Sequence, residues 1–204
     1  MADNSTGVRK LLSHPVIYEA VQYLVGAKRI QRQILKVFVK PAPGERILDL
    51  GCGPSEILRL LPEVDYIGID SSLPYVRSAI RKFSHRGRFI HGEINEIETK
   101  NLGVFDIVIA IGVLHHLGDS AANNVFHVAR NALAPGGRFF TVDPCFFDGQ
   151  SWMSKFVVAC DRGTNVRHLK DYAVLAENSF AEISTHLLHG SLPFPHAVCV
   201  LECR

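Results

Sequence analysis

The stretch from Ile47 to Glu56, which reads ILDLGCGPSE, constrains the fold of this chain most strongly. It begins with a short apolar run interrupted only by Asp49, which predicts a strand buried on both faces. Gly51 and Gly53 then permit a sharp turn and a close approach to a ligand, because glycine has no Cβ atom. Pro54 suits the first turn of a following helix. The stretch therefore predicts a strand, a glycine turn and a helix N-terminus whose free backbone N–H groups face a nucleotide-sized pocket.

The acid inside this stretch separates two classes of ligand. A dinucleotide site of the form G-x-G-x-x-G needs a third glycine at the position where this chain has Glu56. The pattern here is instead Asp49-x-Gly51-x-Gly53. A carboxylate at the end of the strand would repel a pyrophosphate and attract a positively charged amine. The pattern favours a ligand that carries an amine, and an ordinary glycine-rich turn is the alternative interpretation.

Composition limits the class of protein without pointing to a polyanion partner. The 204 residues suffice for one domain with a core, and 22 Lys and Arg against 20 Asp and Glu leave a net charge of +2. The five cysteines form no C-x-x-C pair, so we expect neither a metal site nor a disulfide framework. No apolar stretch is long enough to cross a bilayer, and the N-terminus lacks a secretory signal. We therefore expect a cytoplasmic protein with reduced thiols and no membrane span.

Two further predicted strands end next to acids. The segment Asp65–Asp70 predicts a strand whose last residue, Asp70, has two carboxylate oxygens suited to the hydroxyl groups of a ribose. A helix N-cap is the alternative role for Asp70. Arg88–His91 predicts the next strand, and Glu93 beyond it suits an exocyclic amine such as adenine N6. Ile94 would then pack against the ring, although a solvated acid in a loop explains Glu93 equally well.

The most apolar strand predicted, Val104 to Ile111, leads to the adjacent histidines His115 and His116. The carboxyl end of a central strand is where α/β sheets place their chemistry, and an imidazole titrates near neutral pH. Either histidine is therefore a candidate general base, and a structural role is the alternative. Because neighbours in a helix or a strand point in different directions, we do not expect the pair to bind a metal.

The sequence after the two histidines predicts alternating helices and strands, except in residues 144–165. We expect a helix that begins at Gly118–Ser120 and ends at Pro135–Gly137, then a strand over Arg138–Val142. Residues 144–165 show no clean period, so they are interpreted as an aromatic substrate lid or as packing against the N-terminal helix. A helix capped by Asn165 follows, and the last two strands, Ala181–His189 and His196–Cys203, are expected to pair antiparallel.

The N-terminal residues predict a helix with one basic face. Between Pro15 and Lys40, apolar residues recur on one side of the predicted helix: Ile30, Ile34, Val37 and Phe38. Basic residues recur on another: Lys28, Arg32, Lys36 and Lys40. This stripe is either a solvated face or a contact surface for nucleic acid or an acidic substrate. Tyr18 and Tyr23 precede it and are candidates to cover a ligand.

Taken together, these motifs resemble those of the class I S-adenosylmethionine-dependent methyltransferases. The resemblance covers about residues 40 to 203 and is sharpest in four segments: Ile47–Glu56, Gly68–Ser72, Phe105–Leu117 and Leu133–Val142. The last two segments are typical of the small-molecule branch. The resemblance implies a Rossmann-like three-layer α/β sandwich whose seven-stranded, mostly parallel sheet has the order 3-2-1-4-5-7-6, with the last strand antiparallel. We therefore expect a methyltransferase domain at residues 41–204 that follows an N-terminal helical cap at 1–40, with residues 144–165 as the candidate substrate lid.

The resemblance also implies roles for particular residues. Asp49, Gly51, Cys52 and Gly53 would surround the methionine portion of the cofactor, and the Ala110 carbonyl group would face its amine. Asp70 would hold the ribose, Ser71 would lie beside the adenine, and Glu93 and Ile94 would contact the adenine amine and ring. No metal is implied. One departure from the family is Ser55, which stands where many members have a third glycine.

The implied reaction transfers the activated methyl group of S-adenosylmethionine to a nucleophile and leaves S-adenosylhomocysteine. Positioning of the acceptor is the main task, and His115 is the first candidate for a base, with Asp148 second. The Asn/Asp-Pro-Pro-aromatic motif of enzymes that methylate base amines is absent, because Ala110–Val113 occupies that place. We therefore expect a small organic acceptor, with a nucleic-acid methyltransferase or a non-catalytic binding domain as alternatives.

Overall fold

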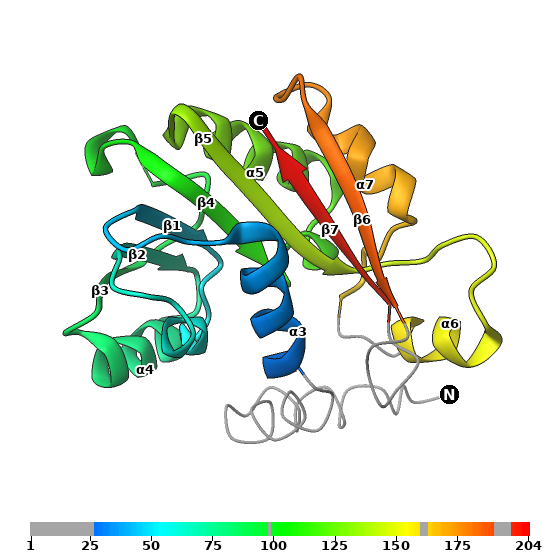
Figure 1. Cartoon of the computed structure of the whole chain (residues 1–204), viewed down its shortest axis with the longest axis horizontal. Coiled ribbons are helices and arrows are strands. Elements are labelled where there is room, and N and C mark those ends of the chain that lie inside the picture. The colour runs from blue at the N-terminus through cyan, green and yellow to red at the C-terminus, as the bar shows by residue number, and fades with distance from the viewer. Residues whose placement is uncertain (1–26, 98, 160–162, 190–196) are drawn as a thin grey trace, which may run out of the picture.

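The computed structural model describes residues 27–97, 99–159, 163–189 and 197–204, and the structural statements below concern these residues. Within them, one sheet has the strand order β3-β2-β1-β4-β5-β7-β6 (Figure 1). The strands are β1 (Arg46–Leu50), β2 (Asp65–Asp70), β3 (Gly87–His91), β4 (Phe105–Ile111), β5 (Leu133–Pro144), β6 (Ile183–His189) and β7 (Ala197–Cys203). β7 runs antiparallel to β5 and β6. The predicted fold class and strand order are confirmed.

Parallel pairing aligns the carboxyl ends of the first strands. β1 pairs with both β2 and β4, so that Asp49 lies level with Gly68 and with Ile109. β4 pairs in turn with β5, and in Figure 1 both run towards the side of the molecule where helix α6 (Trp152–Ala159) lies. The strand order reverses between β1 and β4, and open α/β sheets bind ligands at the carboxyl ends of strands at such a point.

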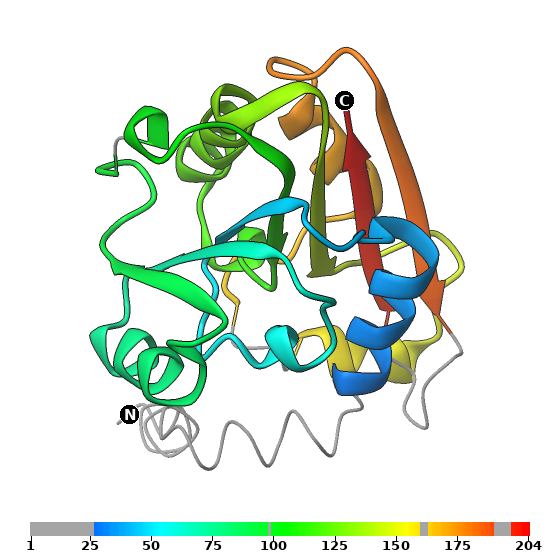
Figure 2. The ribbon, with the colours of Figure 1, turned by 60° about the vertical axis from the view of Figure 1, so that its left-hand side comes forward.

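Helices cover both faces of the sheet and divide its core in two. Helix α3 (Ala27–Ile34) and the π-helical turn η1 (Leu35–Val39) pack on one face with the 3-10 turn η2 (Glu56–Arg59). Helices α5 (Asp119–Ala132) and α7 (Leu169–Ala176) pack on the other face (Figure 2). These two layers hold the sheet between them.

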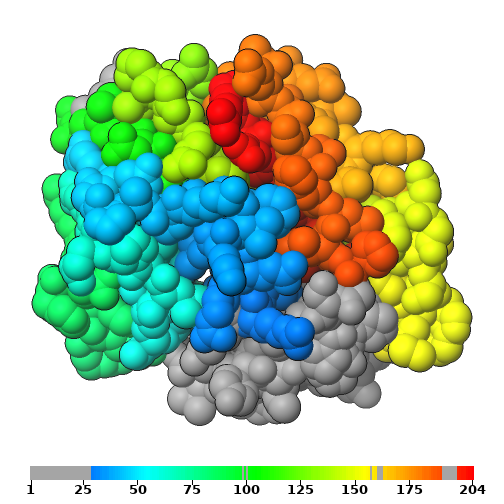
Figure 3. Space-filling model, in the orientation of Figure 1, coloured from blue at the N-terminus to red at the C-terminus, as the bar shows by residue number. Residues whose placement is uncertain are grey.

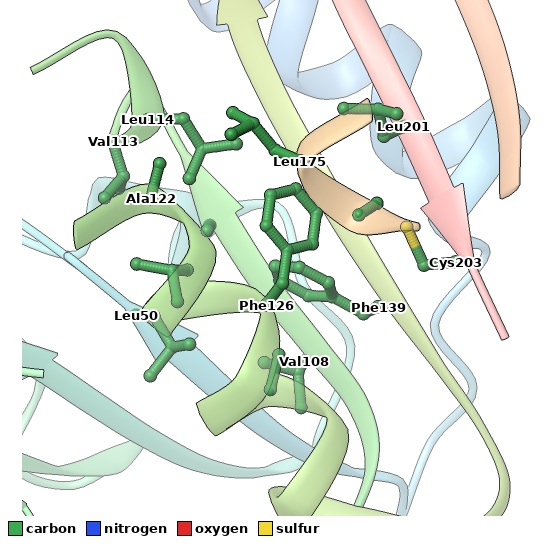
Figure 4. Packing of buried hydrophobic residues seen from close by; sticks show 14 of the residues in the cluster. Leu50, Val108, Val113, Leu114, Ala122, Phe126, Phe139, Leu175, Leu201 and Cys203 are labelled. Carbon is green, nitrogen blue, oxygen red and sulfur yellow. The ribbon is translucent and has the colours of Figure 1, made fainter. Parts of the chain in front are cut away.

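Aromatic rings fill the centre of the second layer. Phe126 of α5 meets Phe139 of β5 edge to face, with ring centroids 5.6 Å apart and planes at 82° (Figure 4). Both rings are fully buried, as are Val108 and Leu50 below them. Burying each ring stabilises the fold by about 1.5–3 kcal/mol relative to exposure. This packing fixes α5 against β4 and β5, the strands that lead to the candidate site.

The predicted helix after the glycine turn is wrong in extent. The chain forms only the 3-10 turn η2, and Pro54 lies in the turn before it. Ser55 precedes η2 in the left-handed region with φ 54°. A few residues separate this turn from Pro62, which leaves little room to propagate an α-helix beyond its costly first turn. Ile57 and Leu58 are nevertheless buried as their apolar character suggested.

The N-terminal helix does not keep the regular α-helical period that its sequence predicts. The π-helical turn η1 adds one residue to a turn, so that Leu35 and Val39 point into the core and Val37 is 47% exposed. The predicted inward position of Val37 is therefore wrong. Figure 3 shows the segment that begins with α3, in blue, across the middle of one face of the molecule. Tyr18 and Tyr23, and most of the predicted cap at residues 1–40, lie outside the described residues.

The start of strand β5 and the N-terminal cap of helix α7 differ from the sequence prediction. Strand β5 begins at Leu133, so Pro135–Gly137 belongs to the strand and does not end the helix. A Cβ atom at Gly137 would lie 2.9 Å from Leu133 Cδ2, which shows how tightly this irregular start of the strand is packed. Helix α7 is capped by His168, so the predicted cap at Asn165 is wrong. The described residues also form helix α4 (Leu73–Phe83) and the 3-10 turn η3 (Thr99–Leu102).

Segment 144–165 contains helix α6, whose apolar side chains are mostly turned outward. Trp152 is 77% exposed and Phe156 is 64% exposed, while Ser154 is buried and accepts a hydrogen bond from Gln150. None of the described helices is both long and apolar enough to cross a membrane.

Candidate active site

A pocket of about 480 Å³ lies at the carboxyl ends of β1, β2 and β4. It brings together eight of the nine residues predicted to contact a cofactor: Asp49, Gly51, Cys52, Gly53, Asp70, Ser71, Glu93 and Ile94. Ala110, the ninth, does not line it. That residue is buried inside β4 beside Thr141, and its successors Ile111 and Gly112 face the pocket instead. The roles of all nine residues in cofactor binding stay predictions.

The glycine turn brings the backbone close to β4. Gly51 has φ 75°, and a Cβ atom there would lie 2.6 Å from Val113 Cγ2. Gly53 also has a positive φ, of 54°, but its surroundings are open. Gly51 is therefore required by both conformation and space, whereas Gly53 is favoured by conformation alone.

The backbone N–H groups of this turn are not free, contrary to the sequence prediction. Gly51 and Cys52 both donate to the Ile69 carbonyl group, at 2.8 and 2.9 Å. Gly53 donates to Asp70 Oδ2 at 2.7 Å, and Ser55 donates to the Cys52 carbonyl group at 3.0 Å. Pro54 has no N–H group to offer. The turn therefore lacks the cradle of amides that a phosphate needs.

Asp49 lies at the floor of the pocket and is only 3% exposed. Its Oδ2 atom accepts a hydrogen bond of 2.6 Å from the Tyr66 hydroxyl group. Burial raises the pKa of Asp49 from 3.8 to about 7, against the lowering effect of the Tyr66 hydrogen bond, and the charge of Asp70 adds to the increase. A ligand with a positive charge would stabilise the ionised carboxylate.

Asp70 holds the turn and the next helix in place. Its two oxygens accept hydrogen bonds from the backbone N–H groups of Gly53 and Ser72, at 2.7 and 2.8 Å. Each carboxylate oxygen has a second lone pair, so Asp70 can still accept protons from a ligand. Asp70 can therefore hold the start of the next helix and still bind the hydroxyl groups of a ribose.

The far end of the pocket opens into a second groove. Glu93, Ile94 and Leu117 line both spaces, and the second, about 770 Å³, continues along α5 past Asn123 and Asn124. The second groove is larger, but it has neither the glycine turn nor the acids Asp49 and Asp70. We therefore assign the nucleoside to the smaller pocket.

Several pocket residues were missed by the sequence analysis. Gln31 of α3, Glu56 of η2 and Tyr75 of α4 all line it, beside the candidate base His116. Glu56 is held by Lys82 at 2.7 Å and by Arg59 at 2.6 Å. Gln31 and Tyr75 belong to no recognisable motif, and only the packing of their helices places them here.

The two adjacent histidines have different surroundings. They lie in the 3-10 turn η4 (Leu114–His116), with ring centroids 4.0 Å apart, so the expectation that they would point apart is wrong. His116 lines the pocket, whereas His115 is 5% exposed and does not. His115 Nδ1 lies 2.7 Å from Asp143 Oδ1 at the end of β5. A carboxylate at Nδ1 fixes the tautomer in which Nε2 is the proton acceptor.

Gly163 and Asn165 cover His115. Asn165 donates a hydrogen bond to the His115 carbonyl group at 2.9 Å. Gly163 packs directly on the ring, where a Cβ atom would collide with His115 Cδ2. Asp148, the second candidate base, lies elsewhere on segment 144–165, at the surface. It pairs with Lys170 at 3.1 Å and with His168 at 3.3 Å, and the hydrogen bond from Lys170 lowers its pKa.

Known proteins resemble this chain over part of its length. A family model described as a methyltransferase domain matches residues 47–137. The chain is 34% identical over 125 residues to a 37.1 kDa protein of transposon TN4556 from Streptomyces fradiae. The matched region covers 58% of this chain and 35% of that protein. It is 31% identical over 136 residues to the malonyl-[acyl-carrier protein] O-methyltransferase of Legionella pneumophila, covering 62% and 45% respectively. The chain thus spans less than half the length of these curated relatives.

A solved structure shows the same fold. The pyocyanin biosynthetic protein PhzM matches with a TM-score of 0.72 at 16% identity, over 99% of this chain and 62% of that chain. The fold and the matched family model define a methyltransferase domain of the Rossmann-like type. The family match over residues 47–137 and this fold support the resemblance to the class I S-adenosylmethionine-dependent methyltransferases.

Proposed function

We propose that this chain transfers the methyl group of S-adenosylmethionine to a small organic acceptor. The observation that supports this most strongly is the chemistry of the pocket. Its turn amides are already bonded within the protein, and it is lined by Asp49, Glu56, Asp70 and Glu93 with no lysine or arginine among its described lining residues. Such a pocket disfavours phosphates and suits a nucleoside with positive sulfonium and amine groups.

The residues present fit this cofactor. Asp70 would accept the ribose hydroxyl groups, Glu93 the adenine amine and Asp49 the methionine amine, while Ile94 would pack on the adenine. The cofactor, when bound, supplies a methyl group that is already activated for attack. What the protein must add is alignment of the acceptor and, where needed, removal of its proton.

The acceptor side is proposed to lie between His115 and segment 144–165. His115 is oriented by Asp143, and Gly163 packs directly on its ring. The exposed Trp152 and Phe156 of α6 make this segment apolar, which suits a lid over an apolar acceptor. The PhzM likeness and the malonyl-[acyl-carrier protein] O-methyltransferase relative support a small-molecule acceptor.

One observation favours an RNA acceptor as a second candidate. Arg32, Lys36, Lys40 and Arg59 line a groove of about 660 Å³ on the surface of α3, η1 and η2. This is the predicted basic stripe, now joined by an arginine from η2. Binding of RNA that weakens steeply with salt would support this candidate, and absence of binding at low salt would remove it.

Transfer of a labelled methyl group tests the proposed activity directly. The purified chain is incubated with S-adenosylmethionine labelled in its methyl group and with a metabolite extract or total RNA. Label in a small organic compound supports the proposal, and label in RNA supports the second candidate. A chain that binds the cofactor but labels neither would be a binding domain without this activity.

Replacing Asp70 by alanine is expected to weaken S-adenosylmethionine binding at least about tenfold, or about 1.4 kcal/mol. The variant loses the proposed ribose contacts and also the acceptor of the Gly53 and Ser72 N–H groups. Calorimetric titration measures the affinity, and circular dichroism checks that the variant is folded. Asp65→Ala is the matched control, because Asp65 lies at the other end of β2 and pairs with Arg46 at the surface. Equal affinity in Asp70→Ala and the control would contradict the ribose assignment.

A further inference from the structure

A short hydrogen bond between two buried side chains lies beneath the pocket. Tyr66 is 1% exposed, and its hydroxyl group donates to Asp49 Oδ2 at 2.6 Å. Two glycines leave space for the ring. A Cβ atom at Gly87 would lie 2.8 Å from Tyr66 Cδ1, and one at Gly68 would lie 3.1 Å from Cε1. The Tyr66 hydroxyl group is therefore held at a fixed position below the Asp49 carboxyl group.

Ser55 gives Tyr66 a second partner. Its Oγ atom lies 3.4 Å from the Tyr66 hydroxyl oxygen, and its side chain is 1% exposed. Serine adopts the left-handed conformation of this position less readily than glycine does. Unlike glycine, however, serine provides a hydroxyl group that can form a hydrogen bond with Tyr66. A phenol has one proton, so Tyr66 can donate to an ionised Asp49 while accepting from Ser55, or accept from a protonated Asp49 while donating to Ser55.

Among the described residues, no lysine or arginine lines the pocket beside Asp49, and His116 is the lining histidine. Asp70 at the end of β2 and Cys52 in the turn are the titratable neighbours that face it along with Tyr66. Arg59 and Lys82, which do not line the pocket, are paired with its lining residue Glu56. Burial raises the pKa of Asp49 to about 7, and the Tyr66 hydrogen bond lowers it from a still higher value. The described lining residues thus supply no lysine or arginine to balance Asp49.

We propose that Tyr66 is a positioning residue for cofactor binding, which orients Asp49 toward the pocket and couples capture of the cofactor amine to release of one proton from Asp49. The proton passes to solvent, and the protonated amine of the ligand replaces it as the positive partner of the carboxylate. Tyr66 favours this exchange because its hydroxyl group stabilises the ionised form. The inference rests on the proposed function, since it needs an S-adenosyl ligand in this pocket.

Calorimetric titration of the full chain with S-adenosylhomocysteine between pH 6 and 8.5 tests the coupling. Titrations in two buffers of different ionisation enthalpy count the protons exchanged. We expect release of about one proton per ligand at pH 6 and close to none at pH 8.5, with affinity rising over this range. In Tyr66→Phe, we expect the rise to move up by about one pH unit, so that binding is about tenfold weaker at pH 6 and close to wild type at pH 8.5.

Two controls separate this role from general damage to the fold. Tyr172→Phe also removes a buried hydroxyl group, which donates to the Pro144 carbonyl group at 3.0 Å, and should keep the wild-type pH profile. The ligand 5′-methylthioadenosine lacks the α-amino group of the amino-acid portion, so its affinity should not depend on the ionisation of Asp49 or on Tyr66. Binding of S-adenosylhomocysteine without proton release, or with the same pH profile in Tyr66→Phe, would overturn the inference and leave the proposed function intact. No binding at any pH would overturn both.

Discussion

Replacing His115 by alanine is expected to lower the turnover number about 100- to 10,000-fold, the usual contribution of a general base, while affinity for S-adenosylmethionine stays within about twofold. His115 lies outside the cofactor pocket, and its Nδ1 atom lies 2.7 Å from Asp143 Oδ1, a contact that favours the tautomer whose basic nitrogen is Nε2. Steady-state kinetics with the acceptor identified by methyl labelling measures turnover, and calorimetry measures cofactor affinity.

Two companion variants make this result interpretable. His115→Ala leaves the buried Asp143 carboxyl group without its imidazole partner, so the variant must be shown to be folded. Asp143→Asn preserves the size of that side chain but alters the hydrogen bond that sets the His115 tautomer, and it should also lower turnover. His85→Ala, at an exposed histidine outside the pocket, serves as the control. Normal turnover in folded His115→Ala would remove this residue from the mechanism.

Replacing Asp49 by asparagine is expected to stabilise the ligand-free protein at pH 8 and to weaken S-adenosylmethionine binding by tenfold or more. In the folded protein the pKa of Asp49 is raised from 3.8 to about 7. The unfolded chain therefore ionises first as pH rises, and the fold loses stability between about pH 4 and 7, by ~4 kcal/mol in total. Asparagine carries no charge at any pH, so the variant avoids this loss and also lacks the carboxylate that would bind the amine.

Thermal unfolding at pH 4.5 and pH 8 tests the stability part of this expectation. The melting temperature of Asp49→Asn should exceed that of the wild type by several degrees at pH 8 and by much less at pH 4.5. Asp106→Asn provides the control, because Asp106 is exposed and accepts a hydrogen bond only from the Arg46 backbone among the described residues. A difference that is equal at both pH values would show that Asp49 ionises normally, and unchanged cofactor affinity would remove it from the binding site.

The sheet was predictable because its strands carry their own signals. Apolar runs that end in Asp49 and Asp70 have few other interpretations, and parallel pairing then forces both acids to the same edge. The local turns were less predictable. The serine in a left-handed conformation at position 55 and the π-helical turn after Ile34 change the direction of side chains without any change in hydrophobic pattern.

The interactions that set the chemistry of the site are long-range. Tyr66 lies 17 residues from Asp49, and Asp143 lies 28 residues from His115, so neither hydrogen bond can be derived from spacing. The free amides expected at the glycine turn were wrong for the same reason, because Ile69 and Asp70 of the neighbouring strand accept them. Sequence therefore located the pocket but did not reveal which of its polar groups were already paired.

A crystal structure of the chain grown or soaked with saturating S-adenosylhomocysteine tests the central claim most directly. The account predicts the ligand in the smaller pocket, with its ribose at Asp70 and its amine toward Asp49. An empty pocket, or a ligand bound only in the groove along α5 beside Asn123 and Asn124, would contradict it.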